Sequence, residues 1–222
     1  MKKNKNGLNK KQIEFLNEYT KGTWTYNPTT GLVDVNGDFI CYNKGIKNLY
    51  GIKFGNVYGD FQIGKNRITS LEGAPQVVGS VFCCEENAIT SLEGAPQRIG
   101  ESFYCYDNNL TSLEGGPQDL GGDYVCAENN LINLKGAPKD IVERFICTGN
   151  KLKSLEGLPK KDYSGNGSFI CDHFTLDQGE WNNEGWVKIF NEGDQVVKQL
   201  VYDMLDEEVI EKLKFESWFG QD

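Results

Sequence analysis

Apolar positions recur along most of this 222-residue chain with a period of 21 residues. Each unit opens on an aromatic residue, and these residues are Phe61, Phe82, Phe103, Tyr124 and Phe145. Two positions later a second inward column follows, made of Ile63, Cys84, Cys105, Cys126 and Cys147. An internal period of this length predicts a solenoid, because each unit can bury its apolar face only against neighbouring units.

The unit at residues 82–96 shows how one rung is built. Phe82 and Cys84 lie two positions apart, so in a strand both side chains point into the core. Asn87 follows, and its amide can bond the backbone groups of a bend. Ile89 and Leu92 return to the core before a tight Glu-Gly-Ala-Pro turn. We therefore expect about seven rungs, with a concave parallel sheet and short irregular connections on the convex side.

An N-terminal cap is expected over residues 1–37. Asn9 stands at a helix N-cap position with Gln12 at the third helical position, which is the spacing of a capping box. The helix is expected to run to about Lys21, where Gly22 ends it.

A hairpin is expected to follow this helix. Residues 24–26 and 32–35 alternate as strands do, and the Asn-Pro-Thr-Thr-Gly sequence between them has turn chemistry. Asn36-Gly37 predicts a further turn. A cap of this kind covers the open end of a solenoid, where an exposed sheet edge invites aggregation.

The repeat period stops after Phe174, so the solenoid is expected over residues 38–174 and a C-terminal cap over residues 175–222. Apolar residues between Val196 and Leu205 fall on one face of an amphipathic helix, and a second short helix is expected near Val209. The same segment is open to a functional interpretation, as an effector or dimerisation element.

The repeat resembles the leucine-rich repeat pattern L-x-L-x-x-N-x-L-x-x-L, with aromatic residues and cysteines in its first two apolar places. Its F-x-C-x-x-N-x-L-T-S-L-E-G-A-P form is similar to that of leucine-rich repeat proteins of tailed bacteriophages, over about residues 24–173. The resemblance implies a leucine-rich repeat solenoid of the α/β class, mostly β. It also implies a phage-encoded protein that acts inside the infected bacterium.

The charge and the hydropathy of the chain exclude several kinds of partner. The formal net charge is −9 and the pI is about 4.8, which argues against a nucleic-acid binder because phosphate neutralisation needs a basic surface. No segment has the apolar length of a secretory signal or a membrane span. We therefore expect a cytoplasmic protein with no nucleic-acid or membrane partner.

The pattern of the cysteines and of the turn glutamates predicts structural roles for them. Six of the seven cysteines share the second inward column, which predicts small buried thiols rather than a disulfide framework or a zinc site. A ladder of glutamates on the turn, interrupted by Lys135, predicts a solvated edge rather than a calcium site. No metal or cofactor is expected.

Cys171-Asp172-His173 is the one candidate for catalytic chemistry. Cys171 belongs to the buried column and Asp172 faces the opposite way along a strand, so the three residues do not form a nucleophile and base. The sequence therefore predicts a protein that is not an enzyme.

The outward positions of the strands vary from rung to rung, and they are the candidates for binding. The column between the two inward residues is apolar and aromatic, and acidic residues run beside it, as on many protein-binding surfaces. The predicted partner-binding residues are Ile40, Tyr42, Gln62, Cys83, Glu85, Glu86, Tyr104, Tyr106, Asp107, Val125, Glu128 and Ile146. Two alternatives stay open: β-propensity alone favours such residues, or the C-terminal segment covers them.

These observations favour a non-enzymatic protein-binding module whose concave face binds a host protein. The alternative is a structural or self-assembling subunit, a homo-oligomer or virion component, that uses the C-terminal helices.

Overall fold

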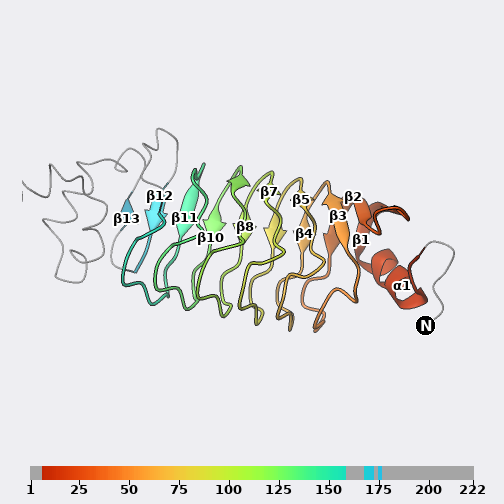
Figure 1. Ribbon diagram of the computed structural model, residues 1–222, viewed down its shortest axis with the longest axis horizontal. Helices are drawn as coiled ribbons and strands as arrows, with labels where there is room; N and C mark the ends of the chain where they lie inside the picture. Colours follow the sequence, from red (N-terminus) through yellow and green to blue (C-terminus); the bar gives the residue numbers. More distant parts are fainter. Residues whose placement is uncertain (1–6, 159–167, 173–174, 177–222) are drawn as a thin grey trace, which may run out of the picture.

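The computed structural model describes residues 7–158 and 168–172, and the backbone of residues 175–176. These residues form a mostly-β parallel solenoid with one helix at its N-terminal end (Figure 1). The predicted solenoid is therefore confirmed. The predicted C-terminal cap and its helices lie outside the described residues, except for Thr175 and Leu176.

Helix α1 (Lys10–Tyr19) begins as the sequence predicts. The Asn9 side-chain oxygen accepts a hydrogen bond from the Gln12 backbone N–H at 3.0 Å, and the Gln12 side chain accepts one from the Asn9 N–H at 2.9 Å. The helix ends two residues before the predicted Lys21, because the chain passes directly into strand β1 (Thr20–Tyr26).

Strand β2 (Val33–Ile40) pairs antiparallel with β1. The predicted turn at Asn36-Gly37 is wrong, since both residues lie inside β2, where Gly37 pairs with Gly22 across the hairpin. β2 also divides the sheet. Its first half pairs with strand β3 (Phe54–Val57) and its second half with strand β4 (Phe61–Gln62).

The second half of β2 begins a parallel ladder that we call the front ladder. It continues through β4, β6 (Phe82–Cys83), β8 (Phe103–Tyr104), β10 (Tyr124–Val125), β11 (Arg144–Ile146) and β12 (Ser168–Ile170). Strand β13 (Thr175–Leu176) is antiparallel to β12. The rungs are in register, so their aromatic side chains stack in the core with centroids 5.1 to 5.9 Å apart.

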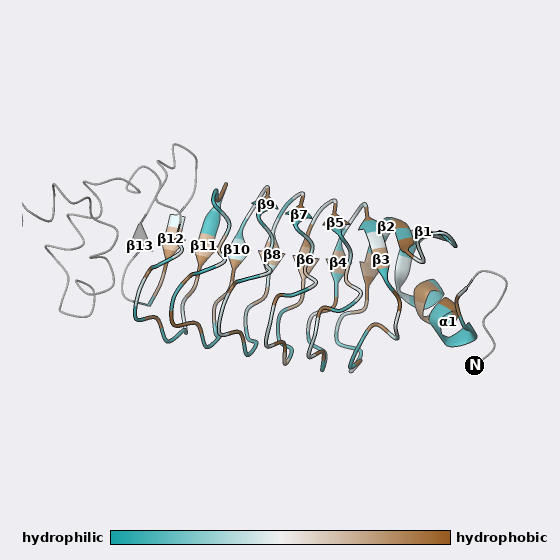
Figure 2. Cartoon of the chain, in the orientation of Figure 1, coloured by the Kyte–Doolittle hydropathy of each residue, from teal (hydrophilic) through white to brown (hydrophobic). Residues whose placement is uncertain are grey.

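A second parallel ladder runs along the other side of each turn. It consists of β3, β5 (Val77–Val78), β7 (Arg98–Ile99) and β9 (Asp119–Leu120). The predicted irregular connections are therefore wrong at these rungs, where regular strands lie. Apolar residues line both ladders from end to end (Figure 2). The concave curvature and the finer assignment to leucine-rich repeats stay predictions.

An asparagine ties each rung to its neighbours. The Asn108 Nδ2 donates to the backbone oxygens of Cys84, Cys105 and Tyr106 at 3.1 to 3.2 Å, and its Oδ1 accepts the Ile89 N–H at 2.9 Å. The same pattern recurs at Asn87, Asn129 and Asn150. The predicted role of this column is confirmed: it satisfies the backbone where the chain leaves the strand.

The cysteine column fills the core beside the aromatic stack. Its members are buried, and Cys41, Cys84, Cys105, Cys126 and Cys147 are free thiols. Burial raises the pKa of each of these thiols, to about 12 for Cys41, which keeps them protonated and unreactive.

Candidate functional site

The outward residues of the front ladder form one continuous stripe, which we call the front face. One residue of each rung contributes, and all of them are half-buried: Ile40, Gln62, Cys83, Tyr104, Val125, Ile146 and Ile170. Apart from Gln62 the stripe is apolar or aromatic. The structure thus brings the middle column of the prediction together on one side of the sheet.

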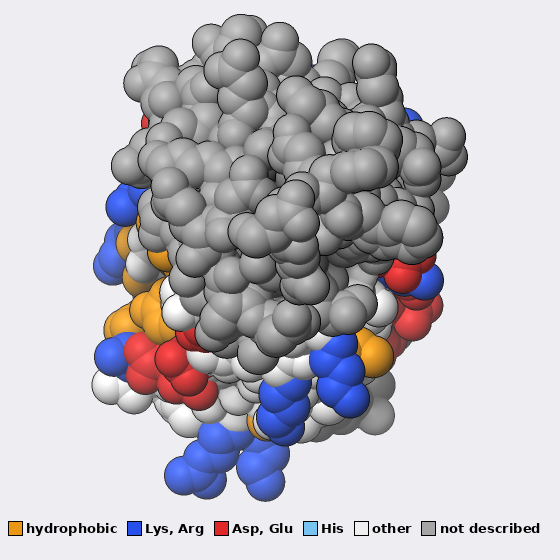
Figure 3. Space-filling view, turned by 90° about the vertical axis from the view of Figure 1, so that its left-hand side faces the viewer, with side chains coloured by type: hydrophobic (Ala, Val, Ile, Leu, Met, Phe, Trp, Pro, Cys, Tyr) orange, Lys and Arg blue, Asp and Glu red, His pale blue; other side chains and the backbone are white. Residues whose placement is uncertain are grey.

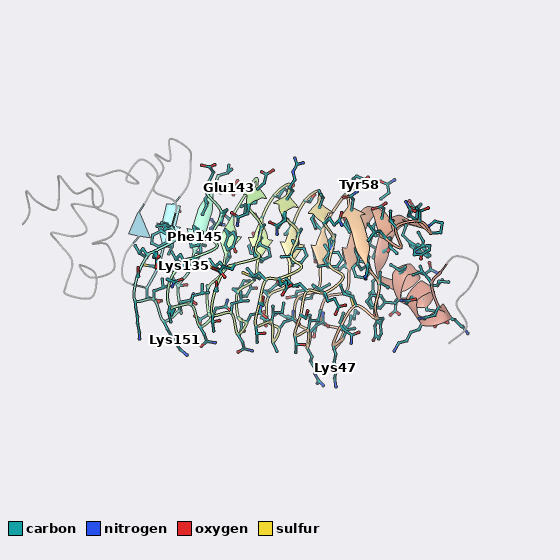
Figure 4. The ribbon with its side chains drawn as sticks, viewed as in Figure 1. Lys47, Tyr58, Lys135, Glu143, Phe145 and Lys151 are labelled. Carbon is teal, nitrogen blue, oxygen red and sulfur yellow. The ribbon has the colours of Figure 1, made fainter. Side chains whose placement is uncertain are left out.

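Charged side chains gather along the edges of the solenoid. Lys47 and Lys151 point away from the body at the lower edge, while Tyr58 and Glu143 lie at the upper edge (Figure 4). Viewed end-on, lysine and arginine side chains cluster along the lower edge, and acidic side chains show on both flanks (Figure 3).

Each rung leaves the front face through a left-handed residue. Asn43, Lys65, Glu86, Asp107 and Glu128 all have φ between 50 and 54°, a conformation that costs a residue with a side chain roughly 1 kcal/mol. Their backbones are held in place by the next rung, as when the Glu86 N–H donates to the Tyr106 oxygen at 3.0 Å. Glu86, Asp107 and Glu128 therefore lie at the corner of the rung rather than on the strand, and we call them the acidic corner.

Glu85 departs from the expectation for an exposed face. Only 5% of the residue is exposed. Its carboxylate lies against Gly64 of the preceding rung, within 2.5 Å of the point where a Cβ on Gly64 would stand. Its Oε2 has no hydrogen-bond partner among the described residues. The signal in the sequence is Gly64 itself, because a missing side chain on one rung leaves room for the side chain of the next.

The surroundings of Glu85 shift its pKa and the pKa values of its neighbours. Burial and, to a smaller extent, the Glu86 charge raise the pKa of the Glu85 carboxyl. Hydrogen bonds from its own backbone and from the Cys83 thiol, and the charge of Lys65, lower it by less. Burial and then the Glu85 charge raise the pKa of Cys83 and of Tyr106. These shifts indicate that Cys83 and Tyr106 each lie near the Glu85 carboxylate.

Lys65 stands on the preceding rung, at the position that Glu86 takes on its own rung. Its Nζ forms an ion pair with a Glu86 carboxylate oxygen at 3.0 Å and lies 5.9 Å from the centroid of the Tyr42 ring. These two partners raise the pKa of the Lys65 ammonium, with Glu86 the larger cause. Tyr42, which is half-buried, therefore joins the site through Lys65.

The column just before the aromatic residues is structural. Asp60 accepts the Val81 N–H at 3.2 Å and Asp123 accepts the Arg144 N–H at 3.0 Å. Arg144 also forms an ion pair with Asp123, which is buried. These residues hold the bend between the two ladders, a role that the sequence pattern alone does not reveal.

The turn side carries a groove of about 630 Å³ near the N-terminal rungs, lined among others by Lys53, Glu72 and Glu93. The serines beside these glutamates have structural roles: Ser70 and Ser91 each accept the N–H of the glutamate two residues later at 3.1 Å. Lys135 and Glu156 lie in the same column of turn residues as Glu72 and Glu93. They form an exposed ion pair, with Nζ and Oε1 3.0 Å apart.

Three further observations concern metal binding, membrane insertion and the segment around Cys171. In the part of the chain that the structure describes, no group of three or more His, Cys, Asp or Glu side chains could hold a metal ion. Within the same residues, no helix has the length and apolarity needed to span a bilayer. Cys171 is buried, and His173 lies outside the described residues.

Comparison with protein-family models, with curated proteins and with solved structures gave no match. The function is therefore inferred from the geometry of the front face.

Proposed function

We propose that this chain is a non-enzymatic protein-binding solenoid whose front face receives the partner. The observation that carries the proposal is the stripe of half-buried apolar residues that continues from rung to rung beside the acidic corner. Protein interfaces have this composition, with apolar and aromatic residues at the centre and polar residues at the rim.

Tyr104 and Tyr106 are the strongest candidates for anchor residues. Both are half-buried and lie on one rung, two positions apart, with the buried Cys105 between them. Tyrosine is enriched among the residues that dominate binding energy. The resemblance of the repeat to bacteriophage leucine-rich repeat proteins supports a finer version of the proposal. In that version the chain is phage-encoded, and in the host cytoplasm it binds a host protein, such as a defence factor that it antagonises.

The test is affinity capture from a lysate of the host bacterium, followed by mass spectrometry. Tyr104→Glu combined with Tyr106→Glu is expected to reduce capture of the partner at least tenfold, with an unchanged circular dichroism spectrum. Tyr58→Glu is the matched control, since Tyr58 is 63% exposed and lies at the upper edge. Equal capture by the double variant and the control would contradict the proposal.

A further inference from the structure

Four rungs of the front ladder contribute to one feature around Glu85. Tyr42, Gly64, Glu85 and Tyr106 each stand three positions after the aromatic residue of their rung, and the rungs are in register. Backbone hydrogen bonds connect these rungs at the next position, as from the Lys65 N–H to the Glu85 oxygen at 3.0 Å. We call this group of four residues the Glu85 slot.

The slot presents a buried carboxylate that its surroundings satisfy only in part. Gly64 supplies no side chain, and the carboxylate of Glu85 reaches into the space that one would fill. A buried charged group without its full set of partners is costly and is normally paired. The Cys83 thiol and the Glu85 backbone already donate to this carboxylate. Its Oε2 has no hydrogen-bond partner within the described residues, so the slot lacks one donor.

The walls of the slot suit a cation. Tyrosine rings stand on the outer rungs at Tyr42 and Tyr106, and aromatic faces attract ammonium and guanidinium groups. The ammonium of Lys65 already lies near the Tyr42 ring and pairs with Glu86 rather than with Glu85. This ion pair is partly exposed, with side-chain exposures of 42% and 33%, so little energy opposes its exchange for a stronger pair.

We propose that the Glu85 slot receives one lysine or arginine side chain of the partner protein, which displaces Lys65 and pairs with the Glu85 carboxylate between Tyr42 and Tyr106. This inference rests on the proposed function, because it assigns the chemistry of the partner at the front face. A pair between a carboxylate and a charged donor is among the stronger hydrogen bonds in proteins. The acidic corner beside the slot, together with the net charge of −9, favours the approach of a basic partner.

The first test uses two small probes, N-acetyl-arginine methylamide and N-acetyl-lysine methylamide, with the full chain. Titration followed by amide chemical shifts is expected to give saturable changes at Gly64, Lys65, Glu85 and Tyr106. Glu85→Gln is expected to weaken binding at least tenfold. Glu93→Gln, which removes an exposed carboxylate from the same repeat, is the matched control and is expected to bind as the unmodified chain does.

A second variant tests the shape of the slot. Gly64→Ala places a methyl group where the Glu85 carboxylate now lies, so it is expected to expel the carboxylate and abolish saturable binding. Equal binding by Glu85→Gln and the unmodified chain would overturn the proposal. Saturation by calcium ions at the same amides, without saturation by either probe, would overturn it as well.

The partner experiment separates this inference from the proposed function. Tyr104→Glu alone disrupts the front face outside the slot, whereas Glu85→Gln changes only the slot. If Tyr104→Glu loses capture and Glu85→Gln keeps it, the slot proposal fails and the function stands. If both variants lose capture by tenfold or more, both are supported. If both capture the partner as the unmodified chain does, both fail.

Discussion

Asn108 and Glu85 are both buried polar residues on neighbouring rungs, at 7% and 5% exposure, but their surroundings differ. The Asn108 amide uses its donors and its acceptor on backbone groups of its own rung and the preceding one. The Glu85 carboxylate leaves one oxygen without a partner. The repeat therefore supplies hydrogen-bond partners for the asparagine that recurs on its rungs. Glu85 occurs on one rung only, and the repeat supplies no partner for its Oε2.

The largest expected effect comes from removing the satisfied group. Asn108→Ala removes four hydrogen bonds from the core and leaves the buried Ile89 N–H without a partner. The three carbonyl oxygens each keep one other donor, from Asn87, Asn129 and the Glu86 N–H. The free energy of unfolding is expected to fall by about 3–5 kcal/mol, measured by urea unfolding. Asn109→Ala, at the exposed next position, is the control and is expected to change it by less than about 0.5 kcal/mol. Similar losses in the two variants would show that the buried hydrogen bonds of the Asn108 side chain do not stabilise the rung.

An intermediate effect is expected where the aromatic column departs from phenylalanine. The Tyr124 hydroxyl is buried without a hydrogen-bond partner in the described structure, and it lies 2.9 Å from the point where a Cβ on Gly116 would stand. Neighbouring repeats have alanine at this place, as at Ala95 and Ala137. Gly116→Ala is therefore expected to cost about 1–3 kcal/mol by overpacking.

Tyr124→Phe removes the hydroxyl and is the partner of this variant in a double-mutant cycle. The pair Gly116→Ala with Tyr124→Phe is expected to recover part of the loss, with a coupling energy of about 1 kcal/mol. The recovery is partial because Leu92 Cδ1 and the Leu113 oxygen lie about as close to the added Cβ as the hydroxyl does. Additive unfolding energies in the cycle would show that the glycine is not there to accommodate the hydroxyl.

The smallest expected effect concerns the unsatisfied group. Burial raises the pKa of Glu85 in the folded chain, so the folded state holds this proton to a higher pH than the unfolded state does. Stability is then lost as the pH rises from the ordinary glutamate pKa of about 4.3 through the raised value, and the loss is complete above it.

Glu85→Gln does not titrate, so its advantage over the unmodified chain is expected to grow across this window and reach about 1 kcal/mol at neutral pH. Urea unfolding of both proteins between pH 4 and 8 measures the difference in their free energies of unfolding. The titration of all groups that the two proteins share cancels in this difference. A difference that stays constant with pH would show that Glu85 keeps its ordinary pKa.

The parts of the fold that could be predicted from the sequence are those in which the same type of residue recurs on every rung. The aromatic, cysteine and asparagine columns are visible because each rung uses nearly the same residue for the same contact. The second ladder was missed because β5, β7 and β9 have two residues each, of which only one is buried, as at Ile99 beside exposed Arg98. A pattern that short shows no alternation.

The candidate site was predicted in part. The middle column of the front face was identified from its apolar character, and its residues are half-buried; their role in binding stays a prediction. The burial of Glu85 was missed because it depends on two rungs at once, through the glycine at position 64. The left-handed conformation of Glu86 was also missed, since residues of very different kinds occupy that column.

The in-register front ladder has a consequence for how such a chain can evolve. Each rung bonds only to its neighbours, so gain or loss of one 21-residue unit by recombination preserves the fold. The Glu85 slot, however, takes one residue from each of four successive rungs, from Tyr42 to Tyr106. A unit inserted after Tyr106 lengthens the solenoid and leaves the slot intact, whereas a unit lost within those four rungs replaces a wall of the slot. If the slot binds as proposed, we expect related chains to vary in length at the C-terminal rungs and to keep the first four rungs together.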